Sequence, residues 1–222
     1  MSTMLPQSRR PELKGLYLIL DPSLRADRPL SDVLKEAADH GVRLFQYRDK
    51  QASMKLAYER ARALRQAALE TRTLLIINDR CDLAMAVDAD GVHVGQEDLP
   101  VAHARALLGG DKIIGLSTHN LEQVRAAESA GADYLGFGPI LSTATKSDHD
   151  PVVGIAGFQA ARGMTSLPIF AIGGIKAGTL PELLRAGADG VAVASAILAA
   201  PDMGRAIADF LTAFRLRGLP VA

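Results

Sequence analysis

The sequence contains a single cysteine, Cys81, among 222 residues. One cysteine excludes an intramolecular disulfide, and so little cysteine fits a reducing cytoplasm, where we expect this protein to be located. Cys81 stands where a helix is expected to begin. We interpret it as a small apolar residue packed at that helix start rather than as a nucleophile.

The sequence also lacks an excess of one charge and any long apolar run. Lys and Arg total 25, and so do Asp and Glu, which gives a formal net charge of zero. No basic face of the kind that binds nucleic acid is expected, and the apolar runs fall far short of the ~20 residues that span a bilayer. Residues 1–14 are basic but have no apolar stretch after them, so they are predicted to be an N-terminal extension and not a signal peptide.

Short apolar runs alternate with longer amphipathic stretches along the whole chain. Eight of the runs are predicted strands: residues 16–20, 42–47, 74–77, 91–94, 113–116, 134–137, 169–172 and 191–194. Their nearly continuous apolar character is typical of parallel strands buried on both faces. Regular alternation of strand and helix predicts right-handed crossovers, and eight strands favour a closed (β/α)8 TIM barrel, an α/β fold that needs roughly 200 residues or more.

A weak internal repeat supports this organisation. Residues 89–92, 131–134 and 187–191 resemble one another, and each leads into a predicted strand. No linker or low-complexity segment divides the chain. We therefore expect one barrel domain over residues 15–222, preceded by the extension at 1–14.

Helical periodicity and helix starts are also readable. The clearest apolar stripe consists of Leu56, Ala57, Ala61, Leu64 and Ala68. The spacing of Asn120 with Gln123, and of Thr179 with Glu182, is that of a capping box and predicts two helix starts.

In a barrel of this kind the active site lies just after the strands, and the second strand ends in unusual residues. Gln46, Arg48 and Lys50 alternate along the chain, so they share a side opposite Phe45 and Tyr47. This places an amide and two cations toward the barrel mouth. A surface cluster of salt bridges is the alternative, and Gln46 argues against it because a buried amide needs partners.

Carboxylates follow the third and fourth strands. Asp79 comes directly after Asn78, and Asp98 follows the next strand along. Mg²⁺ usually takes one or two carboxylates and completes its shell with water and substrate phosphate. Each aspartate could instead cap the following helix, but two of them beside Asn78 and opposite the strand 2 cations favour a metal site.

A long polar loop follows the sixth strand and reaches about residue 154. Thr143, Thr145 and Lys146 offer two hydroxyls and an ammonium to phosphate oxygens. Loops of this length are more often functional than short connections. We expect the loop to close over substrate, with an ordinary surface loop as the alternative.

Glycine and serine follow the last two strands. Gly173 and Gly174 come after the seventh, and the eighth ends in Ala194, followed by Ser195. Many barrels bind a phosphate at this place, where glycine lets an oxyanion approach backbone N–H groups. The sequence therefore predicts two anion-binding regions, and two phosphorylated substrates that meet between them.

Together these motifs resemble the thiamine phosphate synthase family, with a match from about residue 15 to 214. The segments that carry the resemblance are residues 46–50, 78–80, 91–98, 138–146 and 171–175. The resemblance implies that a hydroxymethylpyrimidine diphosphate and a thiazole phosphate are joined, with Mg²⁺, to give thiamine phosphate and pyrophosphate. Pyrophosphate leaves first in that family, and the thiazole nitrogen captures the resulting carbocation.

The resemblance also implies residue roles. The pyrimidine diphosphate would contact Gln46, Arg48, Lys50, Asn78, Ser117 and Lys146. The Mg²⁺ ligands would be Asp79 and Asp98, and the thiazole phosphate would be bound by Thr143, Thr145, Gly174, Ala194 and Ser195. Arg48, Lys50 and Lys146 would be catalytic by neutralising charge on the departing oxygens. Ser142 departs from the proline that the family usually has there, and Ala194 from a residue that is often β-branched.

Two other functions are compatible with the barrel. A related thiazole tautomerase shares the phosphate pocket but needs no metal site for a diphosphate. A non-catalytic barrel that senses thiazole phosphate would bind ligand without turnover. Both Asp79 and Asp98 are present beside Arg48 and Lys50, which favours the synthase. A homodimer is compatible with the sequence, but no exposed apolar stripe predicts one.

Overall fold

Eight parallel strands pair in chain order and close into a barrel in the computed structural model, which describes residues 12–142 and 151–215. The strands are β1 (Gly15–Leu20), β2 (Leu44–Tyr47), β3 (Leu74–Asn78), β4 (Gly91–Val94), β5 (Ile113–Thr118), β6 (Tyr134–Phe137), β7 (Ile169–Ile172) and β8 (Gly190–Val193). Pairing of β8 with β1 closes the ring and removes the open edges of the sheet. The predicted (β/α)8 barrel is confirmed.

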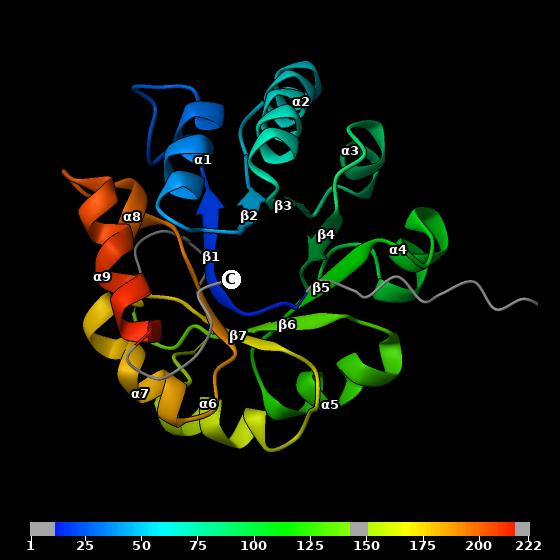
Figure 1. Cartoon of the computed structure of the whole chain (residues 1–222). Coiled ribbons are helices and arrows are strands. Elements are labelled where there is room, and N and C mark those ends of the chain that lie inside the picture. The colour runs from blue at the N-terminus through cyan, green and yellow to red at the C-terminus, as the bar shows by residue number, and fades with distance from the viewer. Residues whose placement is uncertain (1–11, 143–150, 216–222) are drawn as a thin grey trace, which may run out of the picture.

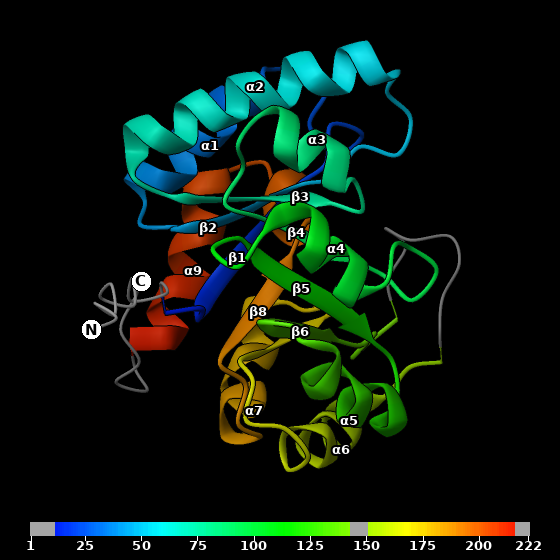
Figure 2. The same cartoon turned by 90° about the vertical axis from the view of Figure 1, so that its right-hand side faces the viewer.

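Helices surround the ring of strands, as Figures 1 and 2 show from two directions. They are α1 (Leu30–Asp39), α2 (Met54–Thr71), α3 (Cys81–Ala86), α4 (Val101–Leu108), α5 (Leu121–Ala130), α6 (Gly154–Arg162), the 3-10 helix η1 (Ala177–Thr179), α7 (Leu180–Arg185), α8 (Ser195–Leu198) and α9 (Met203–Arg215). Among the residues described, none of the helices combines the length and apolar character that a membrane crossing requires.

Strand boundaries differ slightly from the sequence-based expectation, and the differences matter at the barrel mouth. β3 continues to Asn78 and β5 to Thr118, so Asn78 and Ser117 lie within strands rather than after them. β2 begins at Leu44, two residues later than expected. β8 ends at Val193, which leaves Ala194 just beyond the strand.

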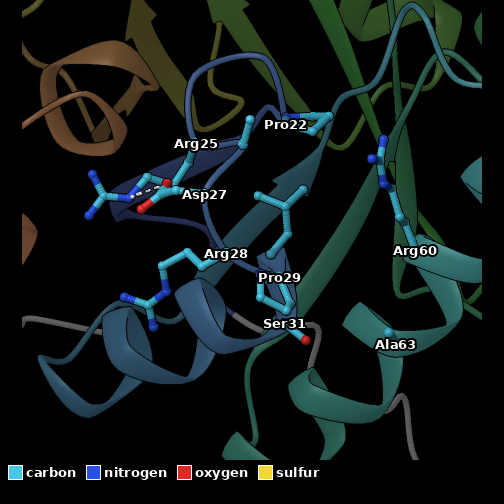
Figure 3. Close-up of a pocket in the computed structure, with 10 residues that line it drawn as sticks. Pro22, Arg25, Asp27, Arg28, Pro29, Ser31, Arg60 and Ala63 are labelled. Atoms are coloured by element: carbon cyan, nitrogen blue, oxygen red, sulfur yellow. Dashed lines mark ion pairs between the residues drawn. The ribbon is translucent and has the colours of Figure 1, made fainter.

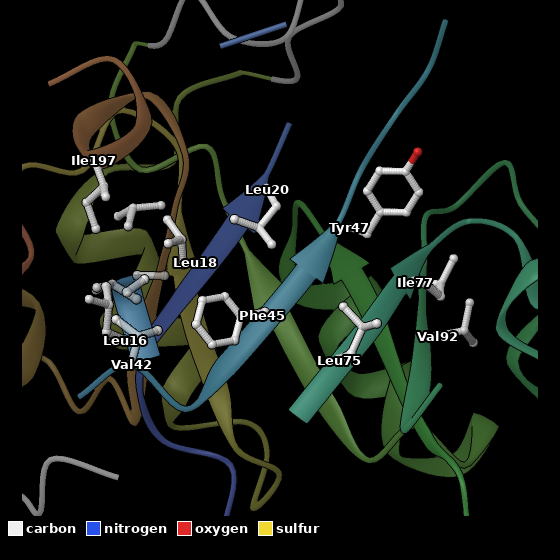
Figure 4. Close-up of a cluster of buried hydrophobic side chains, with 14 of the residues drawn as sticks. Leu16, Leu18, Leu20, Val42, Phe45, Tyr47, Leu75, Ile77, Val92 and Ile197 are labelled. Atoms are coloured by element: carbon white, nitrogen blue, oxygen red, sulfur yellow. The ribbon is translucent and has the colours of Figure 1, made fainter. Parts of the chain in front are cut away.

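Alternation along the strands produces two apolar layers. Side chains such as Leu18 and Phe45 face outward and pack under the helices, in the cluster drawn in Figure 4. Those of Tyr17, Ile76 and Phe170 belong to a second cluster that fills the barrel interior. Positions of one parity therefore face the helices, and positions of the other parity face the barrel axis.

Glycines in the interior make room for rings. A Cβ on Gly115 would lie 2.2 Å from Cζ of Tyr134 and 2.4 Å from Nδ1 of His93. A Cβ on Gly190 would lie 2.5 Å from the Phe170 ring. Since real Cβ atoms do not approach so closely, the aromatic residues of β4, β6 and β7 depend on glycine in the neighbouring strands.

The repeated Ala-Asp segments form the same structure three times at the amino-terminal end of the barrel. Each aspartate precedes a strand, accepts a hydrogen bond from a backbone N–H at the start of the previous strand, and pairs with an arginine of an earlier helix. The three sets are Asp90 with Leu75 N and Arg65, Asp133 with Ile114 N and Arg105, and Asp189 with Ile169 N and Arg162. The repeat thus ties helix, loop and strand together around the base of the barrel.

Two details of the helix predictions are corrected. Leu56 is 39% exposed and lies off the buried face of α2, whose core residues include Ala57, Ala61 and Leu64. The Thr179 hydroxyl does not cap α7. It donates to the Lys176 carbonyl at 2.8 Å, because Thr179 ends the 3-10 helix η1, which directly precedes α7.

The other predicted helix start is partly confirmed. Asn120 caps α5 by accepting from the Gln123 N–H at 3.0 Å. Gln123 accepts from the backbone N–H of His119 rather than from that of Asn120, so the box is shifted by one residue.

Candidate active site at the barrel mouth

Arg48 is positioned at the mouth by a buried aspartate that the sequence analysis did not single out. Its Nη1 lies 2.6 Å from Oδ2 of Asp21, and its backbone N–H donates to the Leu20 carbonyl at 3.0 Å. Asp21 follows β1 and is only 5% exposed. Its place directly after a strand is the signal that could have revealed it, because the same rule identified Asp79.

Lys50 forms an ion pair with Asp79, which joins the segments after β2 and β3. The Lys50 side chain is 56% exposed, whereas that of Asp79 is 19% exposed. Asp79 has a φ of 61° and donates its N–H to the His93 carbonyl at 2.8 Å. A left-handed conformation is uncommon for a residue other than glycine, although aspartate tolerates it better than most. The turn after β3 therefore holds this carboxylate in one place.

Asp79 and Asp98 influence each other. Burial raises the pKa of the Asp79 carboxyl, and the neighbouring Asp98 raises it further, while Lys50 opposes both effects. Asp98 accepts from the Gly95 N–H at 2.7 Å, so its position is fixed as well. The structure brings the two carboxylates together, as the sequence analysis expected.

The alternative prediction, that Asp79 and Asp98 cap the helices that follow them, is wrong. Arg80 precedes α3 and Pro100 precedes α4, so neither Asp79 nor Asp98 occupies a cap position. Within the described ranges, no group of three or more acidic, His or Cys side chains could hold a metal. A pair of carboxylates whose repulsion a cation would relieve fits Mg²⁺, which completes its shell with water and phosphate.

A continuous line of hydrogen bonds crosses the barrel interior below the mouth. Gln46 Nε2 donates to the Tyr17 hydroxyl at 2.9 Å, and the hydroxyls of Tyr17 and Tyr134 are 2.8 Å apart. Nδ1 of His93 lies 2.9 Å from the Tyr134 hydroxyl, and its Nε2 lies 2.9 Å from Oγ of Ser117. We call these five residues the polar chain.

The polar chain is uncharged. Burial lowers the pKa of His93 to about 4, despite the opposing charge of Asp98, so the imidazole is neutral near pH 7. Burial raises the pKa of Tyr17 and of Tyr134 well above the ordinary range, so both hydroxyls keep their hydrogens. In the sequence, Tyr17 and Tyr134 look like ordinary strand residues. The only signal that could have indicated this role is that each, like Gln46, occupies an inward-facing position of its strand.

The loops after β6 and β7 pack backbone against backbone. Ile140 donates to the Ile172 carbonyl at 2.8 Å, and Leu141 to the Gly173 carbonyl at 3.0 Å. Gly174 has a φ of 67°, and a Cβ there would lie 2.6 Å from the Ser142 carbonyl oxygen. Glycine is therefore required at this position by both conformation and space.

The remaining predicted phosphate-binding residues are divided between described and undescribed parts of the chain. Ser195 begins α8 and Ala194 precedes it, next to the interior cluster. Because β7 and β8 are neighbours, Ala194 and Ser195 follow the strand next to the one that precedes Gly174. Thr143, Thr145 and Lys146 lie outside the described residues, so their roles stay predictions.

His119, the residue after β5, forms a structural link. Its Nδ1 lies 2.7 Å from the Gly138 carbonyl oxygen, which joins the end of β5 to the segment after β6. Asn78 ends β3 half-buried, in the inward parity of Ile76. Gln96 donates to the Ser117 carbonyl at 2.6 Å and so braces the end of β5.

A hollow of about 450 Å³ lies between the segment after β1 and the helix α2. Figure 3 shows Arg25 and Arg28 pointing to one side of it, away from Arg60. Their charges are already engaged, by Asp27, Glu36 and Asp49 respectively. This hollow is therefore not the place where the functional groups gather.

Comparisons with known proteins show which family this chain resembles in sequence. A family model described as thiamine monophosphate synthase matches residues 16–197. The thiamine-phosphate synthase of Chloroflexus aurantiacus is 47% identical over 188 residues, covering 85% of this chain and 87% of that protein. That of Halalkalibacterium halodurans is 43% identical over 204 residues, covering 92% and 97%.

A solved structure extends the agreement to the fold. Thiamine phosphate pyrophosphorylase from Pyrococcus furiosus superposes with a TM-score of 0.82 at 36% identity, covering 91% of this chain and 96% of that one. Sequence and fold are thus shared over the same length, and this chain belongs to the thiamine monophosphate synthase family of transferases.

Proposed function

We propose that this protein joins 4-amino-2-methyl-5-(diphosphooxymethyl)pyrimidine to 4-methyl-5-(2-phosphooxyethyl)thiazole, forming thiamine phosphate and releasing pyrophosphate. The observation that supports this most is the set of charges after β2, β3 and β4. Lys50 pairs with Asp79, Asp79 neighbours Asp98, and Arg48 in the same segment as Lys50 is held by Asp21. Two cations and a pair of carboxylates are the groups that a metal-bound diphosphate requires.

The residues suit a dissociative reaction. The bond between the pyrimidine methylene and the diphosphate oxygen breaks first, and the electron pair leaves with pyrophosphate. Arg48, held by Asp21, and Lys50, exposed enough to turn from Asp79 toward a phosphate, would stabilise the charge that develops on the departing oxygens. Lys146 is proposed to act in the same way. The thiazole nitrogen then bonds to the methylene cation.

Mg²⁺ is proposed to be held by Asp79 and Asp98, and when bound it would supply further charge neutralisation at the diphosphate. Gln46, Asn78 and Ser117 are proposed to hold the pyrimidine. Gly174, Ala194 and Ser195, with Thr143 and Thr145, are proposed to receive the thiazole phosphate. Holding both substrates in line supplies the rest of the rate acceleration, and no protein nucleophile takes part.

The first experiment mixes purified protein with both substrates and Mg²⁺ and measures thiamine phosphate by mass. We expect product that disappears when EDTA is added and returns with excess Mg²⁺. Thiazole phosphate binding without product would instead favour the tautomerase or the sensor. Product formed equally well with EDTA would contradict the metal assignment while leaving the reaction in place.

A further inference from the structure

We propose that the hydrogen bonds of the polar chain run in one fixed direction, and that this direction makes the site select a 4-aminopyrimidine over a 4-oxopyrimidine. Tyr17, Tyr134 and His93 would then be positioning residues that determine specificity through Gln46 and Ser117. The inference rests on the proposed function for the identity of the ligand. The direction of the chain is a property of the protein alone.

The direction follows from counting hydrogens, beginning at Gln46. The Nε2 of an amide can only donate, so the Tyr17 hydroxyl accepts from Gln46. Tyr17 has one hydrogen of its own, and its remaining contact is the Tyr134 hydroxyl. Tyr17 therefore donates to Tyr134.

The same count continues to the other end. Tyr134 accepts from Tyr17 and so gives its hydrogen to Nδ1 of His93. Nδ1 accepts that hydrogen and therefore carries none of its own, so the ring hydrogen of His93 lies on the other nitrogen. The His93 proton is therefore on Nε2, where it is donated to Oγ of Ser117.

The two ends of the polar chain therefore offer a ligand opposite hydrogen-bonding groups. Ser117 accepts from His93, so its own hydroxyl hydrogen is available for a ligand. Gln46 uses its NH₂ group on Tyr17, and no residue that the structure describes donates a hydrogen bond to its carbonyl oxygen. Gln46 and Ser117 belong to the inward-facing parity near the carboxyl ends of β2 and β5. One end of the chain accepts and the other end donates.

An aminopyrimidine matches this pattern. Its exocyclic amino group donates, as the Gln46 oxygen requires, and an unprotonated ring nitrogen accepts, as the Ser117 hydroxyl requires. A 4-oxopyrimidine has a carbonyl in place of the amino group and a hydrogen on a ring nitrogen. The donor and the acceptor on this edge of the ring are therefore exchanged. Sites built to hydrogen-bond a polar group discriminate strongly, because a mismatched ligand leaves buried groups unpaired.

The first test measures the protonation of the histidine rings in the wild-type protein by ¹⁵N NMR. We expect His93 to carry its proton on Nε2, with Nδ1 bare. His119 is an internal control of opposite sense, because its Nδ1 faces a carbonyl oxygen and must carry a hydrogen. A proton on Nδ1 of His93 would mean that the chain runs the other way, and would overturn the proposal.

The second test compares kcat/KM for the 4-amino and 4-oxo pyrimidine diphosphates. Tyr17→Phe breaks the chain between Gln46 and Tyr134, so either direction becomes available. We expect the ratio of kcat/KM for the amino compound to kcat/KM for the oxo compound to fall at least about tenfold. The reason is that the site can then reverse its hydrogen bonds and pair with the oxo compound. The matched control is Tyr47→Phe, which also removes a buried hydroxyl, one that is bonded to Asp49 on the helix side of β2.

The outcomes separate the two proposals. An unchanged preference in a folded Tyr17→Phe variant, or an equal loss in Tyr47→Phe, would refute the role of the polar chain. A wild-type protein that makes no thiamine phosphate would refute the proposed function instead. The NMR measurement needs no variant and no substrate, so the direction of the chain is tested even if Tyr17→Phe does not fold.

Discussion

Two carboxylates, Asp79 and Asp98, are the residues on which the proposed chemistry depends most. Each is fixed by the backbone around it, Asp79 through its left-handed turn and Asp98 through the Gly95 N–H. Burial raises the pKa of the Asp79 carboxyl, and the neighbouring Asp98 raises it further. Such an arrangement is costly without a cation, and it is typical of functional sites.

Asp79→Asn and Asp98→Asn should each lower turnover at least about 100-fold, because both remove charge from the proposed metal site while keeping the shape. Binding of the thiazole phosphate, measured by calorimetry, should change little. Asp82→Asn is the control, since that exposed carboxylate on α3 pairs with Arg80. Near-normal rates in both site variants at limiting Mg²⁺ would contradict the metal assignment.

His93 should make the free energy of unfolding depend on pH. Its pKa is about 4 in the folded protein, against an ordinary value near 6.5, because the ring is buried between Tyr134 and Ser117. The unfolded chain therefore binds the proton more readily, so stability is lost as pH falls from 6.5 to 4, by up to about 3 kcal/mol.

Urea unfolding at several pH values, compared between wild type and His93→Gln, isolates this contribution. The difference in unfolding free energy between the two proteins should grow as pH rises from 4 to 6.5 and then stay level. A difference that does not vary with pH would show that His93 titrates normally in the folded protein.

At the scale of elements, the repeated aspartates explain how the strands are held in register at the base of the barrel. Asp133 accepts from the Ile114 N–H at 2.8 Å and pairs with Arg105 at 2.5 Å. Each such residue serves two strands and a helix at once. Their location at the end opposite the mouth is typical of stability rather than of catalysis.

Asp133→Ala should therefore destabilise the protein by about 2–4 kcal/mol, since it leaves a buried N–H and a guanidinium without their carboxylate. Turnover at 25 °C should remain close to wild type. Asp111→Ala, at an exposed position in the segment before β5, is the control and should have little effect on unfolding. A loss of activity without a loss of stability would place Asp133 in the functional machinery instead.

Across the whole molecule, the barrel brings groups from many separate strands to one mouth. Binding there should stabilise the entire fold, because a ligand that binds only the folded state shifts the unfolding equilibrium. Pyrophosphate with Mg²⁺ is the simplest ligand that would occupy the proposed diphosphate site.

At about 100 times its Kd, Mg²⁺-pyrophosphate should add about 2.7 kcal/mol to the free energy of unfolding. For a domain of this size, that corresponds to a rise in Tm of roughly 5–10 °C, measured by calorimetry. EDTA should abolish the rise, and Asp79→Asn should lack it. An equal rise with pyrophosphate alone would separate anion binding from the metal.

The sequence by itself determined the order of strands and helices and which residues follow each strand at the mouth. Apolar runs of strand length and amphipathic helices are local patterns, and the position just after a strand fixes where a side chain such as Asp79 or Gly174 emerges. Parity along β2 placed Gln46 and Arg48 on one side. These features depend on residues close together in the chain, so they can be read without a structure.

Only the tertiary structure decided which side chains meet. Tyr17 and Tyr134 are 117 residues apart and look like ordinary strand residues, yet their hydroxyls join β1 to β6 across the barrel interior. Asp21 likewise meets Arg48 only because β1 and β2 are neighbours in the ring. Such contacts depend on how the strands pair around the closed barrel and on how far each side chain reaches across it. The spacing of residues along the chain contains neither kind of information.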